Sequence, residues 1–99
     1  MLRTTLDLHS VYHSHPFDLQ KEIELRVEKF LQPYLYSKGN SNNHHSIQLE
    51  IIVGRGLHSK ITIEGQHPIR FYTQQYLQKM GYTVRTNPYN EGVLIFFTD

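Results

Sequence analysis

The chain has 99 residues, which is enough for one domain that buries about two-thirds of its unfolded surface on folding. It is 38% hydrophobic, and no apolar run approaches the roughly 20 residues of a membrane span. Because it contains no cysteine, disulfides and thiolate metal sites are excluded. We therefore expect residues 1–99 to form a single soluble domain, intracellular and cytoplasmic, excised from a longer protein.

The net charge of +1 hides an uneven distribution of charge along the chain. Between Gly54 and Asn90 the only acid is Glu64, and the basic residues are Arg55, Lys60, Arg70, Lys79 and Arg85. This half of the chain is expected to attract phosphate groups.

Residues Leu2 to His9 alternate between apolar and polar, which predicts a β-strand. Asp7 and His9 share the polar face at the carboxyl end of this strand. Their carboxylate and imidazole are then close enough for one to orient the other, or for both to act on one substrate atom. The alternative is an acid and a histidine that are simply exposed where a strand ends.

A helix is predicted after the polar segment Ser10 to Phe17, with Asp18 as its N-terminal cap. Its apolar stripe consists of Leu19, Ile23, Val27, Phe30, Leu31 and Tyr34. Since Pro33 has no N–H to donate, the regular helix should end or kink near Gln32. Lys38 to Ser46 then reads as a loop.

The segment Ile47 to Val53 is the most apolar strand and is predicted to be central and parallel to the first. Parallel strands align their carboxyl ends, so Gly54-Arg55-Gly56 should lie at the same sheet edge as Asp7 and His9. The two glycines allow the backbone N–H groups to converge on an anion beside the guanidinium. A glycine pair that only ends a strand in a tight turn is the alternative.

The rest of the chain predicts a loop, a helix and a hairpin. The loop spans Leu57 to Gln66, and the helix starts at Pro68 and stops at Gly81. Its inward residues are predicted to be Ile69, Tyr72, Tyr76 and Met80. The hairpin comprises a strand over Tyr82 to Thr86, a turn over Asn87 to Gly92 and a strand over Val93 to Phe97. The element order is therefore βαβαββ.

Three motifs occur in this order: Leu6-Asp7-Leu8-His9, then Ile51-Ile52-Val53-Gly54-Arg55-Gly56-Leu57-His58-Ser59, then Gly92-Val93-Leu94. Together they resemble the Smr (small MutS-related) domain, particularly its eukaryotic branch, over nearly the whole chain. The chain departs from the family pattern at Val53, where the family usually has His or Thr, and at Phe71, near which it often has Pro. The link Ser10 to Phe17 is also longer than usual.

The resemblance implies an α/β two-layer sandwich in which two helices cover one face of a four-stranded mixed sheet, similar to the C-terminal domain of bacterial translation initiation factor three. It also implies a nucleic-acid endonuclease or binding domain. Several members of the family nick DNA. Others cut messenger RNA on stalled or collided ribosomes in no-go decay, in proteins that often carry ubiquitin-binding modules elsewhere.

On this basis the catalytic candidates are Asp7, His9 and Arg55, and the phosphate-binding candidates are Gly54, Gly56, His58, Ser59 and Lys60. We expect a monomer that cleaves single-stranded RNA with the ribosome as partner and without a required cofactor. The net charge is too small for strong autonomous duplex binding. Three alternatives stay open: a non-catalytic RNA- or ribosome-binding domain, a DNA-nicking enzyme with a divalent ion, and a metal site built from Asp7, His9 and His58.

Overall fold

The computed structural model describes residues 3–37, 47–55 and 65–98. In chain order the elements are β1 (Thr5–Asp7), α1 (Pro16–Ser37), β2 (Gln48–Ile52), α2 (Pro68–Lys79), β3 (Arg85–Asn87) and β4 (Asn90–Phe97). This is the βαβαββ order that the sequence predicts. The predicted loop over Lys38 to Ser46 lies entirely outside the described residues.

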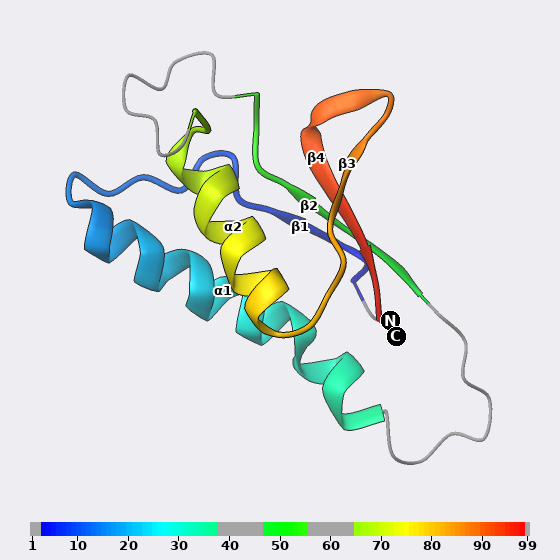
Figure 1. Cartoon of the computed structure of the whole chain (residues 1–99). Coiled ribbons are helices and arrows are strands. Elements are labelled where there is room, and N and C mark those ends of the chain that lie inside the picture. Colours follow the sequence, from blue (N-terminus) through cyan, green and yellow to red (C-terminus); the bar gives the residue numbers. More distant parts are fainter. Residues whose placement is uncertain (1–2, 38–46, 56–64, 99) are drawn as a thin grey trace.

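The four strands form one mixed sheet in the order β1-β2-β4-β3 (Figure 1). β1 and β2 are parallel, whereas β4 is antiparallel to both of its neighbours. The parallel pair is connected through α1, as a parallel connection requires. The predicted central, parallel position of the Ile47 to Val53 strand is therefore confirmed.

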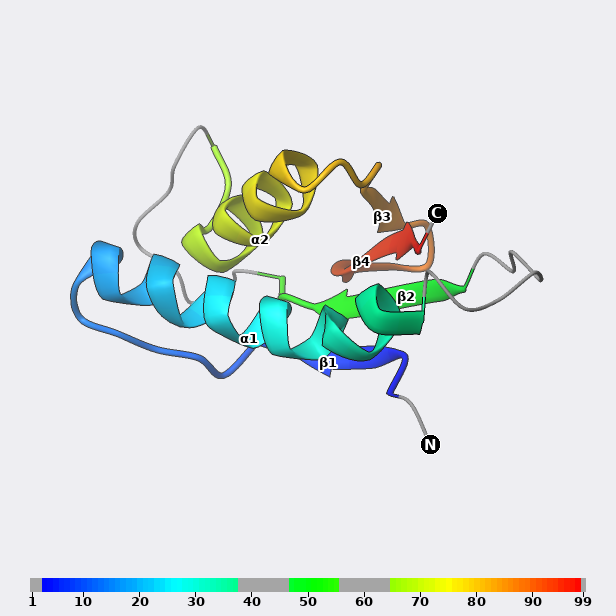
Figure 2. The same cartoon turned by 90° about the horizontal axis from the view of Figure 1, so that it is seen from below.

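One face of the sheet carries the core. Leu6, Ile51 and Leu94 are partners across the three neighbouring strands, so their side chains point to the same side. Buried residues of α1 and α2 join that row in a single hydrophobic cluster. Both helices therefore pack on this face, with α1 alongside β1 and α2 on the side of β3 and β4 (Figure 2). The predicted two-layer arrangement is confirmed.

Helix α1 begins three residues earlier than predicted, at Pro16 rather than after an Asp18 cap. His15 caps it, because Nδ1 of His15 accepts a hydrogen bond from the Phe17 N–H at 3.2 Å and the His15 carbonyl accepts from Leu19 at 3.1 Å. Pro16 fits the first helical position, where no N–H is needed. Asp18 lies in the first turn, where its charge still complements the helix dipole, but it is not the cap.

Of the two outcomes predicted at Pro33, an end of α1 near Gln32 is wrong, since the helix continues through Pro33 to Ser37, and a kink there stays a prediction. The residues on either side explain this. Leu31 is fully buried and Tyr34 is nearly so, and the Tyr34 hydroxyl donates a hydrogen bond to the Arg3 carbonyl beside β1. Burial of these side chains outweighs the roughly 3 kcal/mol that a proline costs inside a helix.

Helix α2 starts at Pro68 and stops at Gly81, both as predicted. Gly81 has a φ of +97°, and the N–H groups of Gly81 and Tyr82 donate to the carbonyls of Gln78 and Leu77 at 3.0 Å each. This is a Schellman cap. The predicted inward residues Ile69, Tyr72 and Tyr76 pack against the core, but the fully buried residues of α2, which the prediction missed, are Thr73 and Leu77. Met80 is 37% exposed at the cap, where the helix no longer faces the core.

The hairpin is tighter than predicted. β3 pairs with β4 as far as Asn87 and Asn90, so the turn has only Pro88 and Tyr89 between the paired residues, and β4 starts three residues earlier than expected. Within the described part of the chain, neither helix has the length and apolarity to cross a membrane.

Candidate active site

Asp7 and His9 are joined by a local turn at the end of β1. Oδ1 of Asp7 accepts a hydrogen bond from the backbone N–H of His9 at 3.0 Å, which is the geometry of an Asx turn. The same oxygen contacts Nδ1 of the His9 ring. The predicted orientation of the imidazole by the carboxylate is therefore present, although His9 lies in the turn beyond the strand rather than in it.

The charge state of Asp7 decides which ring nitrogen of His9 carries the proton. The hydrogen bonds from the His9 side chain and then from its backbone lower the pKa of Asp7 below its ordinary value. Asp7 is therefore ionised at neutral pH and can only accept hydrogen bonds. Nδ1 of His9 must be the donor, and in the neutral ring Nε2 is left with its lone pair. This is the tautomer that a general base needs.

Gly54 lies directly against His9. The β1–β2 pairing continues past Asp7, where the Leu8 N–H donates to the Ile52 carbonyl at 2.7 Å. This brings the Gly54 backbone to His9 so closely that a Cβ placed on Gly54 would lie 3.3 Å from Cβ of His9. The predicted meeting of Gly54 with the Asp7–His9 pair at one sheet edge is confirmed.

A β-bulge directs the chain at this edge. The N–H groups of Val53 and Gly54 both donate to the Gly92 carbonyl, at 2.8 and 3.1 Å, so two residues on one strand oppose one on the other. Gly54 takes a φ of +81°, a conformation that glycine adopts without strain. Arg55 follows, and a Cβ placed on Gly92 would lie 3.3 Å from Cγ of Arg55. The exposed Arg55 side chain therefore lies beside the backbone of Gly92 at this edge of the sheet.

His67 supports this turn from the start of α2, and the sequence did not single it out for that role. Nε2 of His67 lies 3.0 Å from the Gly54 carbonyl, which can only accept, so Nε2 carries the proton and donates. Partial burial is the main cause that lowers the pKa of His67, the Gly54 contact opposes it, and the Arg70 charge lowers it further. His67 is therefore neutral at pH 7 and fixes the carbonyl that precedes Arg55.

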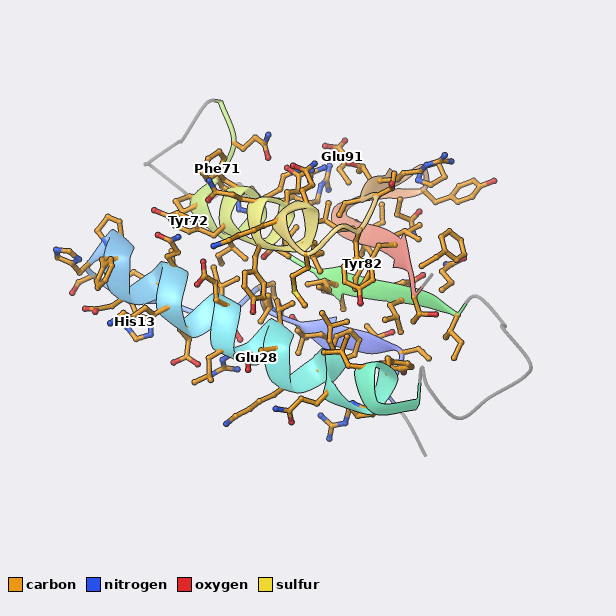
Figure 3. All side chains as sticks on the ribbon, turned by 60° about the horizontal axis from the view of Figure 1, so that its bottom comes forward. His13, Glu28, Phe71, Tyr72, Tyr82 and Glu91 are labelled. Atoms are coloured by element: carbon orange, nitrogen blue, oxygen red, sulfur yellow. The ribbon has the colours of Figure 1, made fainter. Side chains whose placement is uncertain are left out.

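Arg70 joins α2 to the β3–β4 hairpin. One guanidinium nitrogen donates to the Glu91 carbonyl at 2.6 Å and the other to the Thr86 hydroxyl. Figure 3 shows Glu91 on the side of α2 that is away from α1, with Phe71 and Tyr72 at the start of α2. The sequence placed Arg70 among the phosphate-attracting residues, whereas its donors are used to hold the hairpin that carries Gly92.

Four of the predicted phosphate-binding residues lie outside the described residues: Gly56, His58, Ser59 and Lys60. The alternative metal site of Asp7, His9 and His58 also depends on a residue outside the described ones, since His58 would be its third ligand. Among the described residues there is no group of three or more His, Cys, Asp or Glu side chains that could hold a metal ion. The structure therefore brings together Asp7, His9, Gly54 and the backbone of Arg55.

No protein-family model and no curated protein matches the chain. Among solved structures, the SMR domain of NEDD4-binding protein 2 is similar, with a TM-score of 0.54 and 20% sequence identity over 98% of this chain and 86% of that chain. The likeness shows that the chain has the fold of an SMR domain. The fold implied by the sequence resemblance is confirmed.

Substitution of Gly54 by Ala is expected to be more harmful than the same change at Gly65. The two glycines have nearly equal φ values of +81° and +79°, so both changes carry about 1–2 kcal/mol of backbone strain. At Gly54 the new methyl group would meet His9, whereas no described residue lies within 4 Å of a methyl group at Gly65. Urea unfolding and the NMR signals of the His9 ring measure the difference. Equal losses of stability with unchanged His9 signals would contradict the contact.

The pKa of His67 predicts a pH dependence of stability. Since this pKa is lower in the folded chain than in the unfolded chain, the unfolded chain binds the proton more readily. The contribution of neutral His67 is full above about pH 6.5, the pKa of the unfolded chain, and is lost as the pH falls from there through the lower pKa of the folded chain. Unfolding free energies between about pH 8 and pH 5 should fall less steeply for His67→Gln than for the parent. A slope for His67→Gln equal to that of the parent would refute the assignment.

Proposed function

We propose that the chain is an Smr-type endonuclease domain that cleaves RNA by internal transesterification. The contact of Asp7 with His9, at the edge where Gly54 and Arg55 leave the sheet, is the observation that carries this proposal. A domain that only binds nucleic acid needs the arginine but has no use for an oriented acid–imidazole pair.

His9 is the general base of the proposed reaction. Nε2 of His9 takes the proton of a ribose 2′-hydroxyl, the 2′-oxygen bonds to phosphorus, and the bond from phosphorus to the 5′-oxygen breaks. The departing oxygen takes a proton from the imidazolium or from water, which leaves a 2′,3′-cyclic phosphate and a 5′-hydroxyl. Asp7 holds the tautomer and stabilises the imidazolium, and such a base contributes about 10²- to 10⁴-fold to the rate.

Arg55 stabilises the negative charge that develops on the phosphorane. Its planar guanidinium can donate to two phosphate oxygens at once, which a lysine ammonium cannot reproduce. Hydrogen bonds hold the backbone that precedes Arg55. The N–H groups of Val53 and Gly54 donate to the Gly92 carbonyl, and the Gly54 carbonyl accepts from His67. A preorganised donor of this kind is worth on the order of 10²- to 10³-fold.

RNA on the ribosome is the proposed substrate. The proposed chemistry requires a 2′-hydroxyl, which DNA lacks. The net charge of +1 gives the domain little general affinity for duplexes, so it depends on outside targeting. We place it in the cytoplasm, in messenger RNA decay and ribosome quality control (no-go decay), as a monomeric domain of a longer protein that can carry ubiquitin-binding modules.

Cleavage of a single-stranded RNA by the purified chain tests the proposal through three variants. Asp7→Asn leaves the His9 tautomer unsupported and should lower the cleavage rate by at least about tenfold. Arg55→Lys keeps the positive charge but cannot donate to two phosphate oxygens at once. It should lower the cleavage rate by a similar factor and leave the melting temperature unchanged. Arg26→Lys is the matched control, because Arg26 pairs with Glu22 on α1, and should cleave at the parent's rate.

Two results would overturn the proposal. Full activity in Arg55→Lys would remove the arginine from the reaction. Binding of RNA by the parent chain without any cleavage would favour the alternative of a non-catalytic RNA- or ribosome-binding domain.

A further inference from the structure

Two tyrosines near the candidate active site are almost entirely exposed. Tyr12 follows the turn that contains His9 and is 81% exposed, and Tyr89 in the β3–β4 turn is 97% exposed. By contrast, Tyr34 is buried, and Tyr72, Tyr76 and Tyr82 are partly buried. Exposed aromatic rings that a folded chain presents to water are candidates for contacts with a ligand.

The chain on either side of Tyr12 is anchored. The Val11 N–H donates to the Leu8 carbonyl at 3.1 Å, and the Val11 side chain packs against the core. On the other side, Nε2 of His13 lies 3.5 Å from Glu22 of α1, and Figure 3 shows His13 beside the first turns of that helix. The loop therefore holds Tyr12 outward between two fixed neighbours.

Tyr89 is held in the same manner. Its N–H donates to Oδ1 of Asn87 at 2.8 Å, and the preceding Pro88 has a fixed φ. Asn87 and Asn90 are paired across the turn. Both tyrosines are thus displayed on ordered backbone, so little conformational entropy remains to be lost when a ligand binds.

The sheet topology places the two tyrosines on opposite sides of the catalytic candidates. In the strand order β1-β2-β4-β3, Tyr12 follows the end of β1, Arg55 follows β2, and Tyr89 lies between β3 and β4. The end of β2, the segment that leaves β1 and the hairpin turn lie at one end of the sheet (Figure 1). From β1 to β3 the sheet is about 14 Å wide, which corresponds to about four stacked nucleotides.

From this placement we propose that Tyr12 and Tyr89 are stacking platforms for unpaired bases on either side of the scissile phosphate, in a single-stranded RNA that crosses the carboxyl edge of the sheet. The choice of RNA rests on the proposed function. The strand passes from Tyr12 over the Asp7–His9 pair and Arg55 to Tyr89. Bases in a duplex have no free face for such rings, so the substrate is a single strand.

The spacing of the rings favours nucleic acid over a protein partner. A protein interface has a contiguous apolar centre, whereas here two separate rings flank an exposed arginine. Alternation of aromatic faces with a cation is the pattern that binds single-stranded nucleic acid, because bases stack while phosphates meet the charge.

The absence of tryptophan from the chain provides a direct test. Tyr12→Trp and Tyr89→Trp each introduce one reporter whose fluorescence is quenched when a base stacks on it. Phe97→Trp is the matched control, since Phe97 is also exposed but pairs with Gln48 at the opposite end of β2. The probe is a 2′-O-methyl single strand of about eight nucleotides, which lacks the internal nucleophile and stays intact.

We expect quenching in Tyr12→Trp and Tyr89→Trp but not in Phe97→Trp, and no quenching by the same strand annealed to its complement. Tyr12→Ala and Tyr89→Ala should each weaken binding by about tenfold, and the Phe variants should bind as the parent does. Absence of binding, binding without quenching, or unchanged affinity of both Ala variants overturns the inference. Cleavage by the parent without stacking refutes the inference alone, whereas stacking without cleavage refutes the proposed function alone.

Discussion

The parallel pairing of β1 with β2 is the constraint on which the candidate site depends. It aligns the carboxyl ends of two strands that lie more than 40 residues apart in sequence, and the Leu8–Ile52 hydrogen bond extends this alignment to the residues that follow. His9 and Gly54 then lie so close together that a Cβ placed on Gly54 would be 3.3 Å from Cβ of His9. A slip of one residue would turn Asp7 into the core and expose Leu8, so the register is specified by burial as well as by hydrogen bonds.

The site combines exposed reactive groups with buried supports. Asp7 and His9 are both about half exposed, as groups that must reach a polymer have to be. The two groups that form hydrogen bonds with Gly54 are themselves buried or partly buried. They are the Gly92 carbonyl on β4 and the His67 ring at the start of α2. Arg70 ties α2 to the same hairpin. Movement of α2 against the sheet would therefore disturb both the Gly54 carbonyl, which precedes Arg55, and the hairpin that carries Gly92.

The sequence predicted those features that local patterns determine. Alternation and apolar periodicity correctly predicted the element order, the parallel pair and the stop at Gly81. The prediction failed where tertiary contacts outweigh local preference. Pro33 lies inside α1 because Leu31 and Tyr34 are buried on either side of it. Thr73 and Leu77 of α2 are fully buried, whereas the predicted Ile69, Tyr72 and Tyr76 pack against the core but are only partly buried.

The supports of the site were also beyond reach of the sequence. Asp7 and His9 are two residues apart, so their contact could be predicted from the strand repeat. His67 is 13 residues from Gly54, and Arg70 is 21 residues from Glu91, so these contacts depend on where the start of α2 lies against the sheet. No local pattern reports which acceptor such a side chain will meet.

The central claim is that His9, oriented by Asp7, acts on the 2′-hydroxyl while Arg55 holds the phosphate. The end groups of the cleaved RNA test this claim most directly. The measurement needs only the purified chain, a single-stranded RNA and identification of both new termini by mass spectrometry. Internal attack predicts a 2′,3′-cyclic phosphate and a 5′-hydroxyl. A 5′-phosphate would mean that water is the nucleophile and would contradict the account.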